Sequence, residues 1–116
     1  MGRYSTAHYF LEGLVDLGID YIFANLGTDH VSLIEEMARW DSEGRKHPEM
    51  ILCPHEIVAV HMAGGYALAT GRGQAVFVHV DAGTANACMA SCRARATPMC
   101  TLCRIRSTSP ASSVPM

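Results

Sequence analysis

The sequence predicts an α/β fold in which helices cover both faces of a parallel sheet, a three-layer α/β/α arrangement. Three short apolar segments, residues 20–24, 49–53 and 74–80, are bounded by glycine, proline or polar residues, as strands commonly are. The segments between them are long enough to hold one helix each. Strand–helix–strand units of this kind join parallel strands by right-handed crossovers.

The first predicted element is a helix over residues 6–17. Ser5 precedes it as a helix cap, and Gly18 follows it as a helix stop. At helical spacing, one face holds four apolar residues: Phe10, Leu11, Leu14 and Val15. We expect this face to be the packed one.

The next predicted element is a short buried strand over residues 20–24. A turn follows, and either Thr28 or Asp29 can cap the helix that starts there. That helix is expected to run to about Trp40, with an inner face built from Val31, Ile34, Met37 and Ala38. The polar stretch 41–48 then predicts a surface loop.

A second strand, residues 49–53, ends at Pro54, which does not easily continue a strand ladder. The helix predicted over residues 55–70 is rich in small residues, and these permit a neighbouring backbone to approach closely. Gly71 suits the left-handed position that follows the last turn of a helix.

The last predicted strand, residues 74–80, precedes a helix that is expected from about Thr84 into the region of Arg93. Composition changes along this part of the chain. Residues 1–87 carry a net charge of −6, whereas residues 88–116 carry +4, no acidic residue and four of the five cysteines. We therefore predict a domain over 1–87 and a divergent basic tail over 88–116, with a Ser/Pro-rich end that is expected to be partly disordered.

The composition is that of one soluble domain, with 116 residues of which 17% are charged and 49% hydrophobic. No apolar run approaches the roughly 20 residues that span a bilayer. The N-terminus lacks a basic segment followed by an apolar run, so we expect no secretory signal and a cytoplasmic location. The arginines of the tail are not interleaved with aromatic residues, so no nucleic-acid partner is expected either.

The cysteines of the tail raise the alternative of a zinc site. Four of them provide the thiol number of a structural site: Cys88, Cys92, Cys100 and Cys103. The seven residues between the two pairs are fewer than common zinc-ribbon loops contain, and no glycine supplies a turn. We therefore predict no metal site in these residues.

Three turns that follow strands are expected to meet at one edge of the sheet: residues 25–28, 54–56 and 81–84. Glu56 lies in the second of these turns, where a strand leads into the small-residue helix. A crevice at this edge could hold a small polar cofactor or substrate. The alternative, from the residues alone, is that Gly27, Pro54 and Gly83 only make tight turns and Glu56 only complements a helix N-terminus.

Several segments follow one known pattern: Gly18–Phe23, Asn25–Thr28, His55–Glu56, Gly64–Gly71 and Gly83–Ala87. Together they resemble the pyrimidine-binding domain of thiamine diphosphate-dependent enzymes, the group of acetolactate synthase, benzoylformate decarboxylase and oxalyl-CoA decarboxylase. The resemblance implies a partial thiamine diphosphate-binding fold. It also implies a parent lyase or carboligase that acts on a 2-oxo acid or an acyl-CoA analogue.

In that family, the glutamate that corresponds to Glu56 hydrogen-bonds N1′ of the aminopyrimidine ring. It favours the tautomer that removes a proton from the thiazolium carbon. The resemblance therefore implies that Glu56 is the catalytic residue and that the cofactor is contacted by Leu26, Gly27, Glu56, His79, Ala82 and Asn86. His55 and His61 are expected to serve packing rather than acid–base chemistry.

The same family carries a second domain, whose Gly-Asp-Gly…Asn-Asn motif binds magnesium and the diphosphate, and it builds each site between two subunits. No such motif occurs in these 116 residues. The resemblance therefore implies half a site, inactive alone and completed by a second copy or a partner subunit. We expect a truncated product with a frameshifted or otherwise divergent end. The alternative is a non-catalytic remnant or interaction module that keeps the fold.

Overall fold

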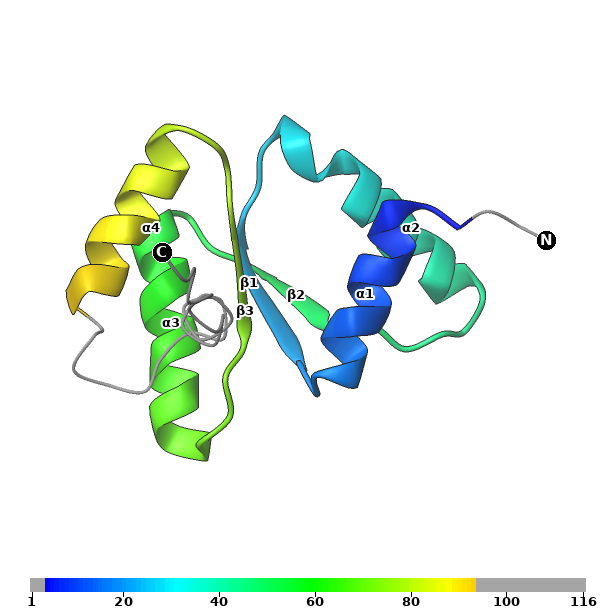
Figure 1. The fold of residues 1–116 in the computed structure, drawn as a ribbon, viewed down its shortest axis with the longest axis horizontal. Helices are drawn as coiled ribbons and strands as arrows, with labels where there is room; N and C mark the ends of the chain where they lie inside the picture. Colours follow the sequence, from blue (N-terminus) through cyan, green and yellow to red (C-terminus); the bar gives the residue numbers. More distant parts are fainter. Residues whose placement is uncertain (1–3, 94–116) are drawn as a thin grey trace, which may run out of the picture.

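The computed structural model describes residues 4–93 and contains a three-stranded parallel sheet with helices on both faces (Figure 1). In chain order the elements are α1 (Thr6–Asp16), β1 (Tyr21–Asn25), the 3₁₀ helix η1 (Thr28–His30), α2 (Val31–Ser42), β2 (Glu49–Leu52), α3 (Glu56–Thr70), β3 (Ala75–Val78) and α4 (Ala82–Arg93). The predicted α/β class is confirmed, and each predicted helix and strand is present within a few residues of its expected bounds.

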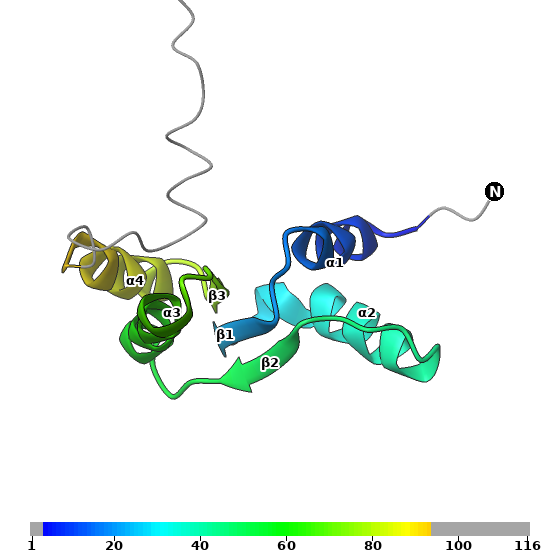
Figure 2. The ribbon, with the colours of Figure 1, turned by 90° about the horizontal axis from the view of Figure 1, so that it is seen from below.

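β1 is the central strand, and the order across the sheet is β2–β1–β3. Phe23 on β1 lies opposite Ile51 on one side and Val76 on the other, with both pairings parallel. Figure 2 shows α1 and α2 on one side of this sheet and α3 and α4 on the other. All three strands therefore end at one edge, and the turns that leave them are brought together there.

Two hydrophobic cores form because successive residues of β1 point to opposite faces. Ile22 and Ala24 are fully buried in the core beneath α1 and α2, where Trp40 is also fully buried. Phe23 points the other way, into the core beneath α3, where it packs with Ala59 and Ala63. The small residues of α3 thus allow this helix to lie close to the sheet, as the sequence predicts.

The buried faces of α1 and α2 differ from those expected. On α1, Leu11 is fully buried, but Phe10 and Val15 are 48% and 42% exposed. On α2, Met37 is buried as expected, whereas three residues of the predicted inner face are exposed: Val31, Ile34 and Ala38. The buried stripe is instead Leu33, Glu36, Met37 and Trp40. The prediction was wrong because it counted only apolar residues, whereas Glu36 is buried on the inner face.

The ends of the helices follow the predicted signals. The Ser5 hydroxyl accepts a hydrogen bond from the His8 amide at 3.1 Å, which caps α1. Gly71 has a φ of 72° and ends α3 in the left-handed conformation that glycine adopts without strain. His55 caps the other end of α3, where its Nδ1 accepts from the Ile57 amide at 3.1 Å. The His55 cap marks the point at which the turn after β2 ends and α3 begins.

None of the helices within residues 4–93 is long and apolar enough to cross a membrane. α4 runs without interruption across residue 87, where the composition of the chain changes. The predicted boundary at that residue therefore lies inside a helix. Most of the expected tail, residues 94–116, and two of the cysteines of the zinc alternative lie outside the described residues.

Candidate functional site

The candidate site is the edge of the sheet at which the three strands end. β1 leads there into the turn that carries Gly27, β2 leads into the start of α3 at Glu56, and β3 leads through His79 into α4. The structure thus brings together turns that are about 30 and 50 residues apart in the chain. The parallel register explains this, because each strand of the sheet runs in the same direction.

Glu56 is the first residue of α3, and only 9% of its surface is exposed. Asn86 on α4 donates a hydrogen bond from Nδ2 to Glu56 Oε2 over 3.1 Å, and His55 Nδ1 lies 3.5 Å from the same oxygen. A backbone hydrogen bond within Glu56 and the Asn86 bond lower the pKa of this carboxyl below its usual value, although burial opposes the change. Glu56 is therefore ionised at neutral pH, partly buried and held from two helices.

Two glycines lie against the side chains of this site. A Cβ atom added to Gly83 would lie 3.0 Å from Glu56 Oε1 and 3.5 Å from His79 Cβ. A Cβ added to Gly27 would lie only 2.1 Å from His79 Nδ1, closer than any side-chain atom tolerates. The His79 ring therefore lies directly against the backbone of Gly27 and excludes any side chain there, whereas a methyl group at position 83 would push against the Glu56 carboxylate.

A second polar group occupies the turn after β1. His79 Nδ1 lies 2.6 Å from Asp29 Oδ1, and His30 Nδ1 lies 3.0 Å from the same oxygen. Sequence reasoning singled out Asp29 only as a helix cap and did not single out His30. The sequence offered one signal for these two residues, which is that they follow Gly27 at a strand end. It offered none for the contact between Asp29 and His79, because the two are 50 residues apart.

The other predicted site residues divide between the edge and the core. The Leu26 side chain packs against the core beneath α1 and α2, so any contact that this residue makes at the edge is through its backbone. Ala82 is exposed at the start of α4. His61 is exposed and bonds the Ile57 carbonyl of its own helix at 2.7 Å, away from Glu56. It therefore takes no part in the cluster at the strand ends.

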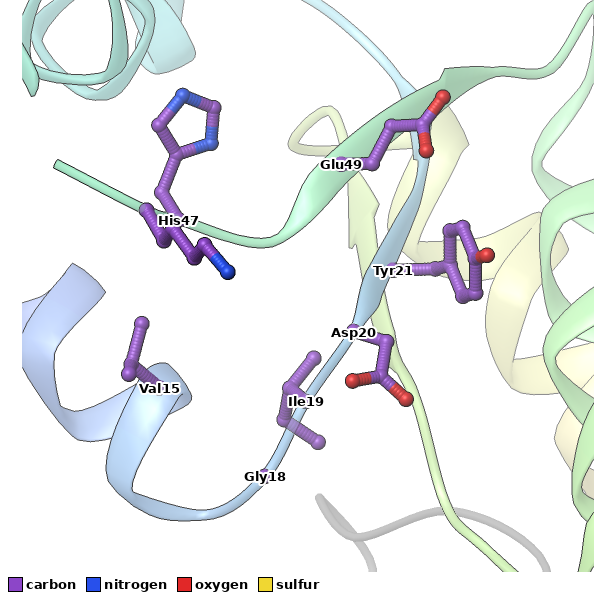
Figure 3. A pocket seen from close by; sticks show the side chains of 8 residues that line it. Val15, Gly18, Ile19, Asp20, Tyr21, His47 and Glu49 are labelled. Atoms are coloured by element: carbon purple, nitrogen blue, oxygen red, sulfur yellow. The ribbon is translucent and has the colours of Figure 1, made fainter. Parts of the chain in front are cut away.

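A hollow of about 440 Å³ lies at the opposite edge of the sheet, where the strands begin (Figure 3). Its lining residues are Val15, Gly18, Ile19, Asp20, Tyr21, Lys46, His47 and Glu49. The Asp20 carboxylate there is already paired with Arg72 at 2.9 Å. Glu56 and His79 do not line this hollow, so the chemistry-bearing cluster and the hollow are separate features.

Comparison with known proteins places the chain in a clear context. Residues 4–112 match the family described as thiamine pyrophosphate enzyme, N-terminal TPP binding domain. The chain is similar to the acetolactate synthase large subunit of Haemophilus influenzae, with 34% identity over 87 residues, which is 75% of this chain and 14% of that protein. It is also similar to the X-ray structure of a putative thiamin diphosphate-dependent enzyme from Mycobacterium smegmatis. In that comparison the TM-score is 0.66 and the identity 31%, over 83% of this chain and 18% of the other.

Proposed function

Because the chain belongs to the family of thiamine pyrophosphate enzymes, as an acetolactate synthase-like N-terminal TPP-binding domain, we propose that the edge around Glu56 binds the aminopyrimidine ring of thiamine diphosphate. The observation that carries the proposal is the buried Glu56 carboxylate, which lies at a strand end beside Gly83, where an added methyl group would press on Oε1. A fixed polar group of this kind is what orients a small heterocycle in a binding site.

The residues present fit such a ring. Glycine at position 83 avoids a methyl group that would lie 3.0 Å from Glu56 Oε1. Asn86 occupies only one oxygen, Oε2, so Oε1 remains the oxygen that a ring nitrogen can reach. The backbone of Leu26 and Gly27 and the Ala82 methyl add small groups at the same edge. These are the contacts that we assign to the cofactor, together with His79.

The ionised state of Glu56 defines its part in the proposed chemistry. A carboxylate accepts a hydrogen bond from a protonated ring nitrogen and stabilises that protonated form. Glu56 would in this way hold a proton at N1′ of the ring and so act as the catalytic acid–base residue of this half of the site. When bound, thiamine diphosphate supplies a carbon nucleophile that adds to the carbonyl of a 2-oxo acid and accepts the electron pair released there.

We assign the parent activity to a lyase or carboligase that acts on 2-oxo acids, by analogy with the relative named an acetolactate synthase. The chain spans 14% of that relative, so the assignment concerns a larger protein. The 116 residues contain no Gly-Asp-Gly…Asn-Asn motif. We propose that magnesium and the diphosphate are bound by residues outside this sequence, on a further segment or on a partner subunit. These residues alone would then be inactive.

Thiamine, which lacks the diphosphate, tests the pyrimidine half by itself. We expect millimolar thiamine to shift the NMR amide signals of Gly27, Glu56 and Gly83 in the labelled chain. Glu56→Gln should remove this response because the fixed charge is lost. Glu49→Gln is the matched control, since Glu49 is an exposed carboxylate at the opposite edge of the sheet. Shifts that cluster around Glu49, or that survive Glu56→Gln, would contradict the proposal.

Calorimetry with thiamine diphosphate and magnesium tests the half-site separately. We expect no tight binding to this chain alone, because the diphosphate contributes most of the charge and its ligands are not among these residues. Tight binding would refute the half-site and leave the assignment of Glu56 standing. The two experiments therefore distinguish the location of the pyrimidine ring from the completeness of the site.

A further inference from the structure

The contact between Asp29 and His79 joins the turn after β1 to the end of β3. Asp29 Oδ1 and His79 Nδ1 lie 2.6 Å apart, and this is the one hydrogen bond that the His79 ring forms within residues 4–93. Burial raises the pKa of the Asp29 carboxyl, but the hydrogen bond from His79 and a backbone bond within Asp29 outweigh it, and the net pKa falls below its usual value. Asp29 is thus a carboxylate at neutral pH and can only accept.

The neighbouring His30 ring settles which imidazole donates. His30 Nδ1 accepts a hydrogen bond from the Gly27 amide at 3.1 Å, so this nitrogen carries no hydrogen. It therefore cannot donate to Asp29 Oδ1, although it lies 3.0 Å from that oxygen. The donor to Asp29 is His79, and His79 must carry its hydrogen on Nδ1.

The second nitrogen of His79 is then left with a lone pair. No group within the described part of the chain, residues 4–93, bonds Nε2, and 41% of the side chain is exposed. The His79 ring lies against Gly27. The Cβ of His79 and Oε1 of Glu56 both lie close to Gly83. The geometry thus leaves an unpaired and partly exposed acceptor on a side chain whose Cβ lies near the same glycine as Glu56 Oε1.

We propose that Asp29 is a positioning residue that fixes the Nδ1–H form of His79 and so presents Nε2 as the proton acceptor of the strand-end site. The inference rests on the proposed function, because it takes the ligand of this site to be the ring bound at Glu56. Nε2 accepts a hydrogen bond from an amino or hydroxyl group of that ligand. If the proton moves fully, the ring becomes an imidazolium whose charge the Asp29 carboxylate balances.

Ring nitrogen NMR of the full chain labelled in histidine tests the tautomer without any ligand. At a pH where the ring is neutral, we expect His79 to carry its hydrogen on Nδ1. Asp29→Ala should abolish this preference and return the ring to a mixture dominated by Nε2–H. Asp29→Asn should preserve the preference, because its amide oxygen still accepts from Nδ1–H. A His79 that is already in the Nε2–H form, or that ignores Asp29→Ala, would overturn the proposal.

Asp41→Ala is the matched control, because Asp41 Oδ1 is paired with His47 Nε2 at 3.1 Å at the other edge of the sheet. It should change the His47 signals and leave those of His79 as they were. An equal response of His79 to both variants would show a general structural effect and count against positioning by Asp29. The backbone amide spectrum of each variant verifies that the fold is intact.

Acylation by diethyl pyrocarbonate, followed by peptide mass mapping, tests whether Nε2 is accessible. We expect His79 to be modified and His8, which is 2% exposed, to be protected. An unmodified His79 would overturn the proposal.

A titration with thiamine tests whether His79 takes part in the site. Thiamine should shift the NMR signal of His79 Nε2 together with that of the Glu56 amide. A shift at Glu56 alone would refute the role of His79 and leave the proposed function intact. If thiamine shifts no signal at Glu56, the proposed function itself is refuted.

Discussion

Asn86 Nδ2 on α4 donates to Glu56 Oε2 on α3 over 3.1 Å, across 30 residues of chain. This bond ties the first turn of α3 to the helix that follows β3, so the position of the Glu56 carboxylate depends on how α4 packs against α3. It also acts with a backbone hydrogen bond to keep the pKa of Glu56 below its usual value. The charge of the candidate site is thus maintained by hydrogen bonds, one of them between two helices, against the opposing effect of burial on the pKa of Glu56.

Asn86→Ala is expected to raise the pKa of Glu56, because the variant removes a donor that favours the ionised form. Titration of the side-chain carboxyl carbon by NMR measures this change directly. Since the folded pKa is lowered, the pair stabilises the fold above the usual pKa of glutamate and loses this contribution as the pH falls through the folded value. Ser91→Ala on the same helix removes only a bond to the Ala87 carbonyl and should leave Glu56 unchanged.

Gly83→Ala should disturb the site more than the fold. The added methyl group would lie 3.0 Å from Glu56 Oε1, so the carboxylate must move, and we expect the thiamine-induced shifts to be lost. Gly65→Ala is the matched control on α3, because nothing lies within 4 Å of the added Cβ. It should raise the free energy of unfolding by about 0.5–1 kcal/mol through helix propensity and keep the thiamine response. Equal thiamine responses in the two variants would contradict this account of Gly83.

Two neighbouring substitutions test which face of α1 is buried. Leu11 is fully buried, so Leu11→Ala should lower the free energy of unfolding by about 2–5 kcal/mol. Phe10 is 48% exposed and contacts Phe77 at a ring distance of 5.7 Å, so Phe10→Ala should cost only about 1 kcal/mol. Urea unfolding of both variants checks this order. A larger loss of unfolding free energy for Phe10→Ala than for Leu11→Ala would show that Phe10, and not Leu11, lies at the centre of the buried face of α1.

The sequence was sufficient for the parts of the fold that depend on local signals. The strand of residues 21–25, the cap at Ser5 and the stop at Gly71 follow from apolar runs and from end residues whose effects reach only a few positions along the chain. The position of Glu56 at a strand end could be predicted for the same reason, because a parallel sheet collects its turns at one edge.

Interactions between distant residues explain what the sequence did not reveal. The inner face of α2 was misjudged because Glu36 is buried only by virtue of its partners, among them His8, 28 residues earlier in the chain. The Asp29–His79 pair is separated by 50 residues, and nothing in the local pattern around either residue indicates it. Both contacts join polar side chains that are distant in the sequence. The periodic spacing of apolar residues, on which the predicted faces were based, contains no information about such pairs.

Glu36 is held by four hydrogen-bonding side chains between α1 and α2. Its carboxylate pairs with Arg39, lies 2.7 Å from His8 Nδ1, accepts from Trp40 Nε1 at 2.9 Å and accepts from the Ser5 hydroxyl at 3.3 Å. The Arg39 bond and, after it, those of His8 and Trp40 lower the pKa of Glu36 to about 2 against the opposing effect of burial. The network therefore stabilises the fold fully above the unfolded pKa of about 4.5 and loses this contribution as the pH falls toward 2.

Glu36→Gln should consequently destabilise the protein most near neutral pH. The variant replaces the carboxylate by a neutral amide that cannot accept from Arg39, Trp40 and Ser5 together. The difference in the free energy of unfolding between variant and wild type should therefore narrow as the wild type becomes protonated. Urea unfolding near neutral pH and again at about pH 3, between the two pKa values, measures this narrowing. Other titrating groups are common to both proteins and cancel in the difference. Glu35→Gln, an exposed neighbour on the same helix, serves as the control. A difference for Glu36→Gln that stays constant with pH would show that the ionised carboxylate does not stabilise the packing of α1 on α2.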